Sequence, residues 1–210
     1  MRILRAVMNP IQTNCYILKE DGHALIFDPS ADINNNIDRI IKKIDGDQVD
    51  AICLTHGHID HISAVDLLVE KYKCPVYIFH LEEKLLNNAS MNGSLQFFNI
   101  PFVLKSNINY IDEGLLKIGD FVLDVVHMPG HTGGHCVYFY KDVIFSGDLI
   151  FKGSIGRMDL ATGNVNQMRS SLKKLLNYNG DYRICCGHGE ETTLDFERKY
   201  NYYLTSDFLD

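Results

Sequence analysis

The stretch Thr55-His56-Gly57-His58-Ile59-Asp60-His61 places three imidazoles and one carboxylate within six residues. The apolar run Val49-Asp50-Ala51-Ile52-Cys53-Leu54 directly precedes it and predicts a short buried strand. Gly57 permits a tight path between the first two histidines, whose side chains then point to the same side of an extended backbone. This combination predicts a metal site at the point where a strand opens into a loop.

Apolar residues at helical spacing follow the ligand loop and predict a helix. Val65, Leu68, Val69 and Tyr72 recur on one helix face, and Ser63 is the expected N-cap of that helix. The unit that carries the first candidate ligands is therefore expected to run from strand to loop to helix.

The rest of the chain alternates in the same way between β-prone and helical segments. The first half of the chain combines strands with helices, and the second half repeats this arrangement. This indicates an α/β (α+β) fold with two sheets packed face to face and helices on the outside. Expected strands cover 3–7, 15–18, 24–27, 75–79, 121–126, 136–140, 143–148 and 183–186, and expected helices cover 31–44, 81–88, 165–176 after the cap Asn164, and 196–204.

Residues 88–109 lose clear periodicity but retain Phe97, Phe98 and Phe102. A lid over a site and a merely packed long loop both fit three phenylalanines. Packing is the more common explanation for aromatic residues in a connection and is favoured here.

Composition bounds the class of protein. The chain has 210 residues, of which 46% are hydrophobic, and this suffices for one domain over 1–210. The formal net charge of -7 disfavours a nucleic-acid partner, because phosphate backbones are bound through clustered Lys and Arg. No run approaches the roughly 20 apolar residues that span a bilayer, and no signal-peptide pattern follows Met1, so a cytoplasmic protein without a membrane partner is expected.

Lone cysteines and histidines outside the motifs are expected to be structural. His23 and His80 are interpreted as satisfied core residues. The cysteines show no Cys-x-x-Cys pair and are expected to be reduced, mostly as core residues; they are Cys15, Cys53, Cys74, Cys136, Cys185 and Cys186.

Three more polar residues follow apolar β-like runs, namely His131, Asp148 and His188. With the four of the first motif they make seven candidate ligands, enough for two divalent metal ions. His56, His58 and His131 would leave a tetrahedral position open on the first ion. Nitrogen and oxygen donors admit zinc, iron or manganese, and zinc is the first expectation. Asp60, His61 and His188 would serve the second ion, and Asp148 could bridge the two.

Four motifs in this order resemble the metallo-β-lactamase superfamily. They are the His-x-His-x-Asp-His run at 56–61, Pro129-Gly130-His131-Thr132-Gly133-Gly134-His135, Ser146-Gly147-Asp148 and Gly187-His188-Gly189. The resemblance implies a four-layer αβ/βα sandwich with the metals at one edge between two central sheets. It also implies that His131 is the ligand of its motif and that His135 either supports the ligands from behind or has a purely structural role.

Within that superfamily, the chain is similar to glyoxalase II (hydroxyacylglutathione hydrolase) and its short relatives. The similarity lies in 156–160 (Gly-Arg-Met-Asp-Leu), in 187–193 and in 197–201. It implies a thioester hydrolase whose partner is a small-molecule thioester, with a glutathione-linked thioester as one option. Ser63-Ala64 replaces the family's frequent paired glycines, and only 22 residues follow His188, so most of the helical region that binds glutathione in larger family members is expected to be missing.

The catalytic roles are assigned to His58, Asp60 and Asp148, which would hold the metals and the water that attacks the thioester carbonyl. Arg157 could pair with a substrate carboxylate through its guanidinium fork, or it could simply pair with Asp159 and hold the loop. Both interpretations of Arg157 remain open from the sequence.

Two other functions are compatible with the same motifs. An iron-dependent persulfide dioxygenase of this superfamily would use one iron, at the positions that match His56, His131 and Asp148. A non-catalytic metal-binding scaffold would normally have lost ligands, whereas all seven are present. A β-lactamase is disfavoured by the missing signal peptide, and a nuclease by the acidic charge balance.

Overall fold

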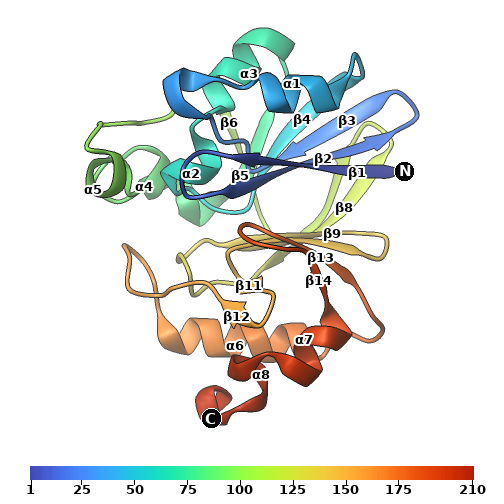
Figure 1. Ribbon diagram of the computed structural model, residues 1–210, viewed down its shortest axis with the longest axis vertical. Helices are drawn as coiled ribbons and strands as arrows, with labels where there is room; N and C mark the ends of the chain where they lie inside the picture. Colours follow the sequence, from blue (N-terminus) through green and yellow to red (C-terminus); the bar gives the residue numbers. More distant parts are fainter.

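Two six-stranded sheets pack face to face, and helices cover their outer faces (Figure 1). The computed structural model describes the backbone of residues 1–210 and every side chain except that of Ile33. The first sheet has the order β1-β2-β3-β4-β5-β6 and the second has the order β14-β13-β10-β9-β8-β7. The predicted αβ/βα sandwich is therefore confirmed.

The first sheet begins as an antiparallel meander and continues with parallel strands. Parallel neighbours need crossover connections, and α1 (Asp38–Ile44) and α3 (Val65–Tyr72) supply two of them on the outer face (Figure 1). The strands are β1 (Arg2–Met8), β2 (Thr13–Glu20), β3 (His23–Phe27), β4 (Gln48–Leu54), β5 (Val76–Phe79) and β6 (Ile108–Ile111).

The second sheet is antiparallel except where β10 runs parallel to β13. Its outer face is covered by α6 (Val165–Leu176), α7 (Leu194–Tyr200) and α8 (Tyr202–Thr205) (Figure 1). The strands are β7 (Gly114–Ile118), β8 (Phe121–His127), β9 (Cys136–Tyr140), β10 (Val143–Gly147), β13 (Arg183–Cys186) and β14 (Thr192–Thr193); β11 (Ile150–Phe151) and β12 (Ser154–Ile155) form a separate hairpin, and η3 (Asp207–Leu209) ends the chain.

Aromatic side chains from both sheets fill the space between them. Phe27 of β3 stacks on Phe145 of β10 with ring centroids 3.7 Å apart, and Tyr138 of β9 meets Phe27 edge to face. All six cysteines are buried thiols, as the sequence predicted. A strand that is buried on both faces has a nearly continuous run of apolar residues, which is why these strands could be predicted from the sequence.

Two helix predictions were wrong near their starts. The helix expected over 31–44 begins only at Asp38, because Asn34 and Asn35 have positive φ angles of 61° and 57°, and the residues before Asp38 form only the 3-10 turn η1 (Ile33–Asn35). Ser63 is not an N-cap, since the short helix α2 (Ile59–Ile62) precedes it and its hydroxyl instead accepts a hydrogen bond from the Ala31 backbone N–H.

The segment 88–109 is more ordered than its lack of periodicity suggested. It contains the short helix α5 (Ser94–Phe98) and the first residues of β6, and Phe102 packs against the core of the first half. Phe97 is 45% exposed, so packing explains only part of this segment. The helix expected over 81–88 is shorter, as η2 (His80–Glu82) and α4 (Glu83–Leu86), and the helix expected over 196–204 is divided at Asn201, whose side chain caps α8.

His23 and His80 are not core residues, contrary to the prediction. Their side chains are 46% and 47% exposed, and each pairs with a carboxylate, Asp50 at 2.8 Å and Asp112 at 2.9 Å. Each imidazole therefore has a surface carboxylate as its polar partner, and neither is packed inside the core as predicted. Among the described residues, no helix is long and apolar enough to cross a membrane.

The His23–Asp50 pair should make stability depend on pH. Its hydrogen bond with Asp50 raises the pKa of His23 above its ordinary value. Stabilisation by the pair is then fully present below about pH 6.5 and is lost as the pH rises through the raised pKa. We expect His23→Gln to lower the Tm slightly at pH 5.5 and to leave it unchanged at pH 9; a loss of equal size at both values would contradict this.

Candidate metal centre

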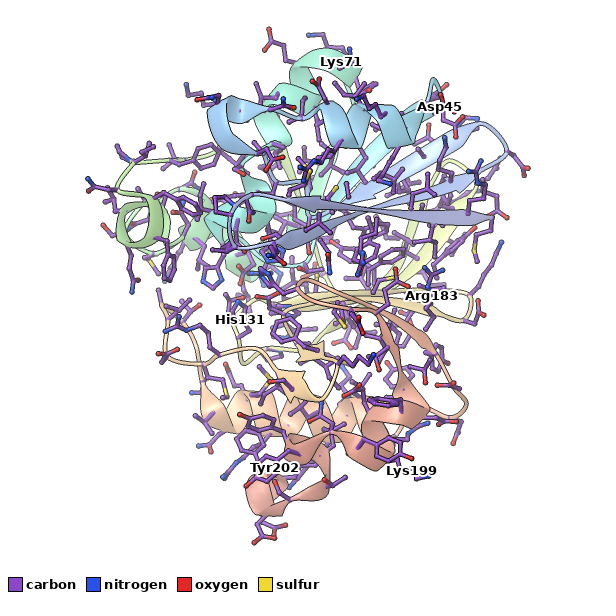
Figure 2. The ribbon with its side chains drawn as sticks, viewed as in Figure 1. Asp45, Lys71, His131, Arg183, Lys199 and Tyr202 are labelled. Atoms are coloured by element: carbon purple, nitrogen blue, oxygen red, sulfur yellow. The ribbon has the colours of Figure 1, made fainter. Side chains whose placement is uncertain are left out.

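The candidate ligands meet at one edge of the two sheets, where the strands that carry them end. His56 and His58 follow β4, Asp148 follows β10, and His188 follows β13. His131 lies in the connection between β8 and β9, at the level between the two halves (Figure 2). The structure brings all seven candidates together, and their role as ligands stays a prediction.

His56, His58 and His131 form the first set. One ring nitrogen of each lies within 4.8 Å of the others, and His58 Nδ1 is 2.9 Å from His131 Nε2. All three side chains are buried. Three imidazole nitrogens around one point are the donor set of a zinc site with one open position.

The second set consists of Asp60, His61 and His188, as predicted from the sequence. Asp60 Oδ2 lies 3.2 Å from the Nε2 atoms of both histidines, which are 3.4 Å apart. Asp148 lies between the sets, with Oδ1 3.4 Å from His61 Nε2 and Oδ2 3.5 Å from His131 Nε2. This carboxylate is therefore placed where a bridging ligand would have to be.

Hydrogen bonds on the far side of the rings orient the imidazoles. His131 Nδ1 donates to the Arg157 carbonyl at 2.8 Å, and His188 Nδ1 donates to the Ile11 carbonyl at 3.2 Å. The Thr55 hydroxyl donates to Asp28 at 2.7 Å, so it accepts from His56 Nδ1 at 3.0 Å. In His56 and His131 the proton is then on Nδ1 and the lone pair of Nε2 faces the centre, which is how a protein fixes a metal-binding histidine. The Ile11 carbonyl likewise orients His188 so that its Nε2 faces the centre.

Charge differs between the two sets. Burial and the neighbouring His131 lower the pKa of His58 to about 3, so its ring is neutral, as a metal ligand must be. Burial opposes protonation of His188 as well, but Asp148 and Asp60 raise its pKa to about 10. The two carboxylates thus hold positive charge at the position that a cation would take.

Buried polar atoms at the centre fit a metal ion. His56 Nε2 and Asp148 Oδ1 are buried and have no hydrogen-bond partner among the described side chains and backbone. A buried polar atom without a partner costs about 1–3 kcal/mol, whereas a metal ion would satisfy both atoms.

Asp28 supports the site and was missed as a functional residue. Its carboxylate accepts hydrogen bonds from the Thr55 backbone N–H at 2.8 Å and from the Thr55 hydroxyl, and it lies 3.2 Å from His61 Nδ1. Asp28 directly follows β3, so the pattern that identified the other polar residues after strands could have found it. His135, expected to be structural, is buried, and its Nε2 accepts a hydrogen bond from the Asp148 backbone N–H.

Glu82 connects the two loops that carry the first set. Its side chain is fully buried, and it accepts hydrogen bonds from Gly57 N–H at 2.7 Å, the Thr132 hydroxyl at 2.7 Å and Gly134 N–H at 2.8 Å. A Cβ atom at Gly134 would lie 2.8 Å from Glu82 Oε1 and from its backbone nitrogen, so only glycine permits this approach. Burial raises the pKa of Glu82, while the three donors favour its ionised form. Glu82 was not among the functional residues predicted from the sequence.

Arg157 pairs with Asp159 at the surface, through Nε at 2.6 Å and a terminal nitrogen at 2.7 Å. Its side chain is 52% exposed. The loop-holding contact is thus present, and a contact with a substrate carboxylate stays a prediction.

Metal addition should stabilise the fold. A ligand at about 1,000 times its Kd adds about 4 kcal/mol to the free energy of unfolding, which for a domain of this size raises the Tm by roughly 10 °C. We expect that rise when Zn²⁺ is added to chelator-treated protein in a thermal scan, and an unchanged Tm after addition of Mg²⁺, which prefers oxygen donors. An equal response to both ions would argue against a histidine-rich site.

Comparisons with known proteins agree with this geometry. Residues 8–188 match the model of the metallo-beta-lactamase superfamily. The chain is 39% identical over 208 residues to the probable metallo-hydrolase YqgX of Bacillus subtilis, covering 97% of this chain and 98% of that protein. It is 34% identical over 203 residues to the hydroxyacylglutathione hydrolase GloC of Haemophilus influenzae, covering 93% and 94%.

Two crystal structures are similar over almost the whole fold. The B3 metallo-beta-lactamase BLEG-1 superimposes with a TM-score of 0.91 at 34% identity, covering 98% of this chain and all of that one. The protein TTHA1623 in a di-iron-bound form has a TM-score of 0.84 at 32% identity, covering 96% and 100%. The chain therefore belongs to the metallo-beta-lactamase superfamily.

Proposed function

We propose that the chain hydrolyses a small acyl thioester at a two-metal centre. The observation that carries this proposal is the placement of Asp148, within 3.5 Å of ring nitrogens from both ligand sets. Two neighbouring cation positions that share one carboxylate would provide the arrangement needed for a water molecule to attack a carbonyl carbon. The relative named hydroxyacylglutathione hydrolase, at 34% identity, supports a thioester as the substrate.

Each ligand set would have its own role in the reaction. His56, His58 and His131 would hold one ion, zinc first among the candidates. Bound divalent ions would lower the pKa of a bound water from 15.7 to about 7 and polarise the carbonyl under attack. Asp148 has a lowered pKa despite its burial, because His188 and His61 lie beside it, so it stays ionised and can orient the attacking water. The second set, with Asp60, would hold the other ion next to the leaving sulfur.

Access to the centre is one-sided. The side chains of His56 and His61 are fully buried, whereas that of His188 is 26% exposed and those of Asp60 and Asp148 are about 10% exposed. A substrate would therefore approach from the side of His188. The buried side would exclude bulk water from the first set.

The direct test is turnover of S-D-lactoylglutathione by anaerobically purified, metal-quantified protein, with thiol release compared against chelator-treated protein. We expect metal-dependent release with zinc, iron or manganese bound. No release with two metals per chain would move the search to other thioesters. No release with about one iron per chain, together with oxygen uptake on a glutathione persulfide, would overturn the hydrolase proposal in favour of the dioxygenase.

A second candidate substrate class is the β-lactams. The similarity to a B3 metallo-beta-lactamase, at 34% identity over 98% of this chain, is the observation that favours it. The amide carbonyl of a lactam would be attacked by the same oriented water. A chromogenic cephalosporin in the same assay separates the two: we expect a kcat/KM far below that for the thioester, and the reverse ranking would make lactam hydrolysis the main activity.

A further inference from the structure

A cavity of about 390 Å³ has Asp60, one member of the second ligand set, in its wall. Its volume lies within the range of about 300–1,000 Å³ that is common for ligand pockets. We propose that this cavity binds an uncharged, mainly apolar group of the substrate and so selects thioesters with an apolar chain. The inference rests on the proposed function, because it assigns this cavity to the same centre.

Part of the cavity wall is formed by large apolar side chains. Phe98, Ile100 and Phe102 come from α5 and the residues after it, and Ile59 of α2 lies next to Asp60. Ile100 is 64% exposed, although it is a large apolar residue. Packing of the fold leaves this side chain in water, whereas an apolar ligand in the cavity would cover it.

Charge in the cavity argues against the carboxylates of glutathione. Asp32 and Asp60 are the charged residues of its lining, which contains no Lys or Arg among the described side chains. Asp32 already accepts a hydrogen bond from the Asn9 backbone N–H at 2.9 Å and lies 3.5 Å from Arg39, and Asp60 faces the two histidines. The described part of the cavity wall thus offers no lysine or arginine to pair with an anionic group, so a neutral group fits better.

The α5 wall is fixed relative to the metal centre. The Ile59 backbone N–H donates to the Asn92 carbonyl at 2.9 Å, and the fully buried Asn92 side chain donates to the Phe102 carbonyl at 2.8 Å. Ser94 Oγ accepts from the Phe102 backbone N–H at 3.1 Å. One backbone hydrogen bond and two between a side chain and the backbone thus join the residue before Asp60 to the apolar wall, and the cavity exists before a ligand enters.

Chain length of the substrate tests the proposal. With acyl esters of one thiol from acetyl to hexanoyl, we expect kcat/KM to rise about three- to fourfold for each added methylene until the cavity is full. A parallel series with a constant acetyl group and lengthening alkyl thiols shows which side of the thioester carries the apolar group. Flat profiles in both series, with turnover intact, would overturn the cavity proposal and leave the hydrolase proposal standing.

Ile100→Asp and Leu115→Asp provide the matched variants. Both positions are exposed, at 64% and 78%, but Leu115 lies on β7, outside the cavity lining. We expect Ile100→Asp to raise KM for the preferred long-chain thioester at least tenfold and to flatten the dependence of kcat/KM on chain length. Leu115→Asp should behave as the unmodified protein, and equal effects of both variants would contradict the assignment.

Binding separates this proposal from the proposed function. The probe is the S-hexyl thioether of N-acetylcysteamine, which cannot be hydrolysed, titrated into metal-loaded protein in a calorimeter. We expect binding that Ile100→Asp weakens at least tenfold and Leu115→Asp does not. If no thioester is turned over but this pattern holds, the cavity assignment stands and the reaction must be revised; if the probe does not bind, the cavity assignment fails.

Discussion

Replacing His58 with alanine is expected to abolish thioester hydrolysis while leaving the fold in place. His58 is buried, and its Nδ1 lies 2.9 Å from His131 Nε2, so its loss leaves the first set with two imidazole nitrogens. Mutation of a residue that merely orients a metal ligand typically lowers metal affinity or activity by about 10–100-fold. Removal of a ligand should therefore lower kcat by more than about 100-fold.

The measurements for His58→Ala are kcat, metal content per chain and Tm in the presence of a chelator. His80→Ala is the control, because His80 is a half-exposed histidine paired with Asp112 on the surface. We expect the control to keep full activity and metal content. Full activity of His58→Ala itself would contradict the assignment of the ligands, and a collapsed Tm without metal would show a structural role instead.

Glu82→Gln is expected to weaken metal binding by about 10–100-fold, although Glu82 would not contact the metal. The amide nitrogen of glutamine must face either Gly57 N–H or Gly134 N–H, whichever way the amide is turned. One backbone donor then loses its acceptor in a buried place, at a cost of about 1–3 kcal/mol. The loops of His58 and His131 would shift apart as a result.

Metal affinity of Glu82→Gln is measured by competition with a chromogenic chelator, and the absorption spectrum of the Co²⁺-loaded protein reports the geometry of the site. Glu197→Gln is the matched control. Glu197 is also fully buried and accepts hydrogen bonds from the Thr192 hydroxyl at 2.6 Å, Gly153 N–H at 2.9 Å and the Asn201 side chain at 2.7 Å, but it lies within α7 and not in a ligand loop. We expect both variants to lose stability and Glu82→Gln alone to lose affinity. Equal metal affinities of the two variants would show that Glu82 has only a structural role.

Local sequence patterns were sufficient to predict the sandwich and the grouping of the candidate ligands. Apolar runs that end in polar residues show where strands end, and strands of one sheet end at a common edge. His56 and His131 are 75 residues apart, yet each was recognisable from its own few neighbours.

The residues that were missed depend on contacts between distant segments. Glu82 stands beside Glu83 in Leu-Glu-Glu-Lys, which reads as an exposed helix face, and its partners are 25 to 52 residues away. His23 was misplaced for the same reason, since its partner Asp50 is 27 residues away. The interruption of the helix at 31–44 follows from left-handed backbone angles at two asparagines, which apolar periodicity does not register.

The ligand sets draw on both halves of the chain. His56, His58, Asp60 and His61 follow the first sheet, while His131, Asp148 and His188 follow the second. A bound ion would therefore act as a cross-link between the halves, closing a chain loop of more than 70 residues between His58 and His131. Separation of the halves would then require metal release first, so the lifetime of the folded protein against proteases would be set by how slowly the metal dissociates.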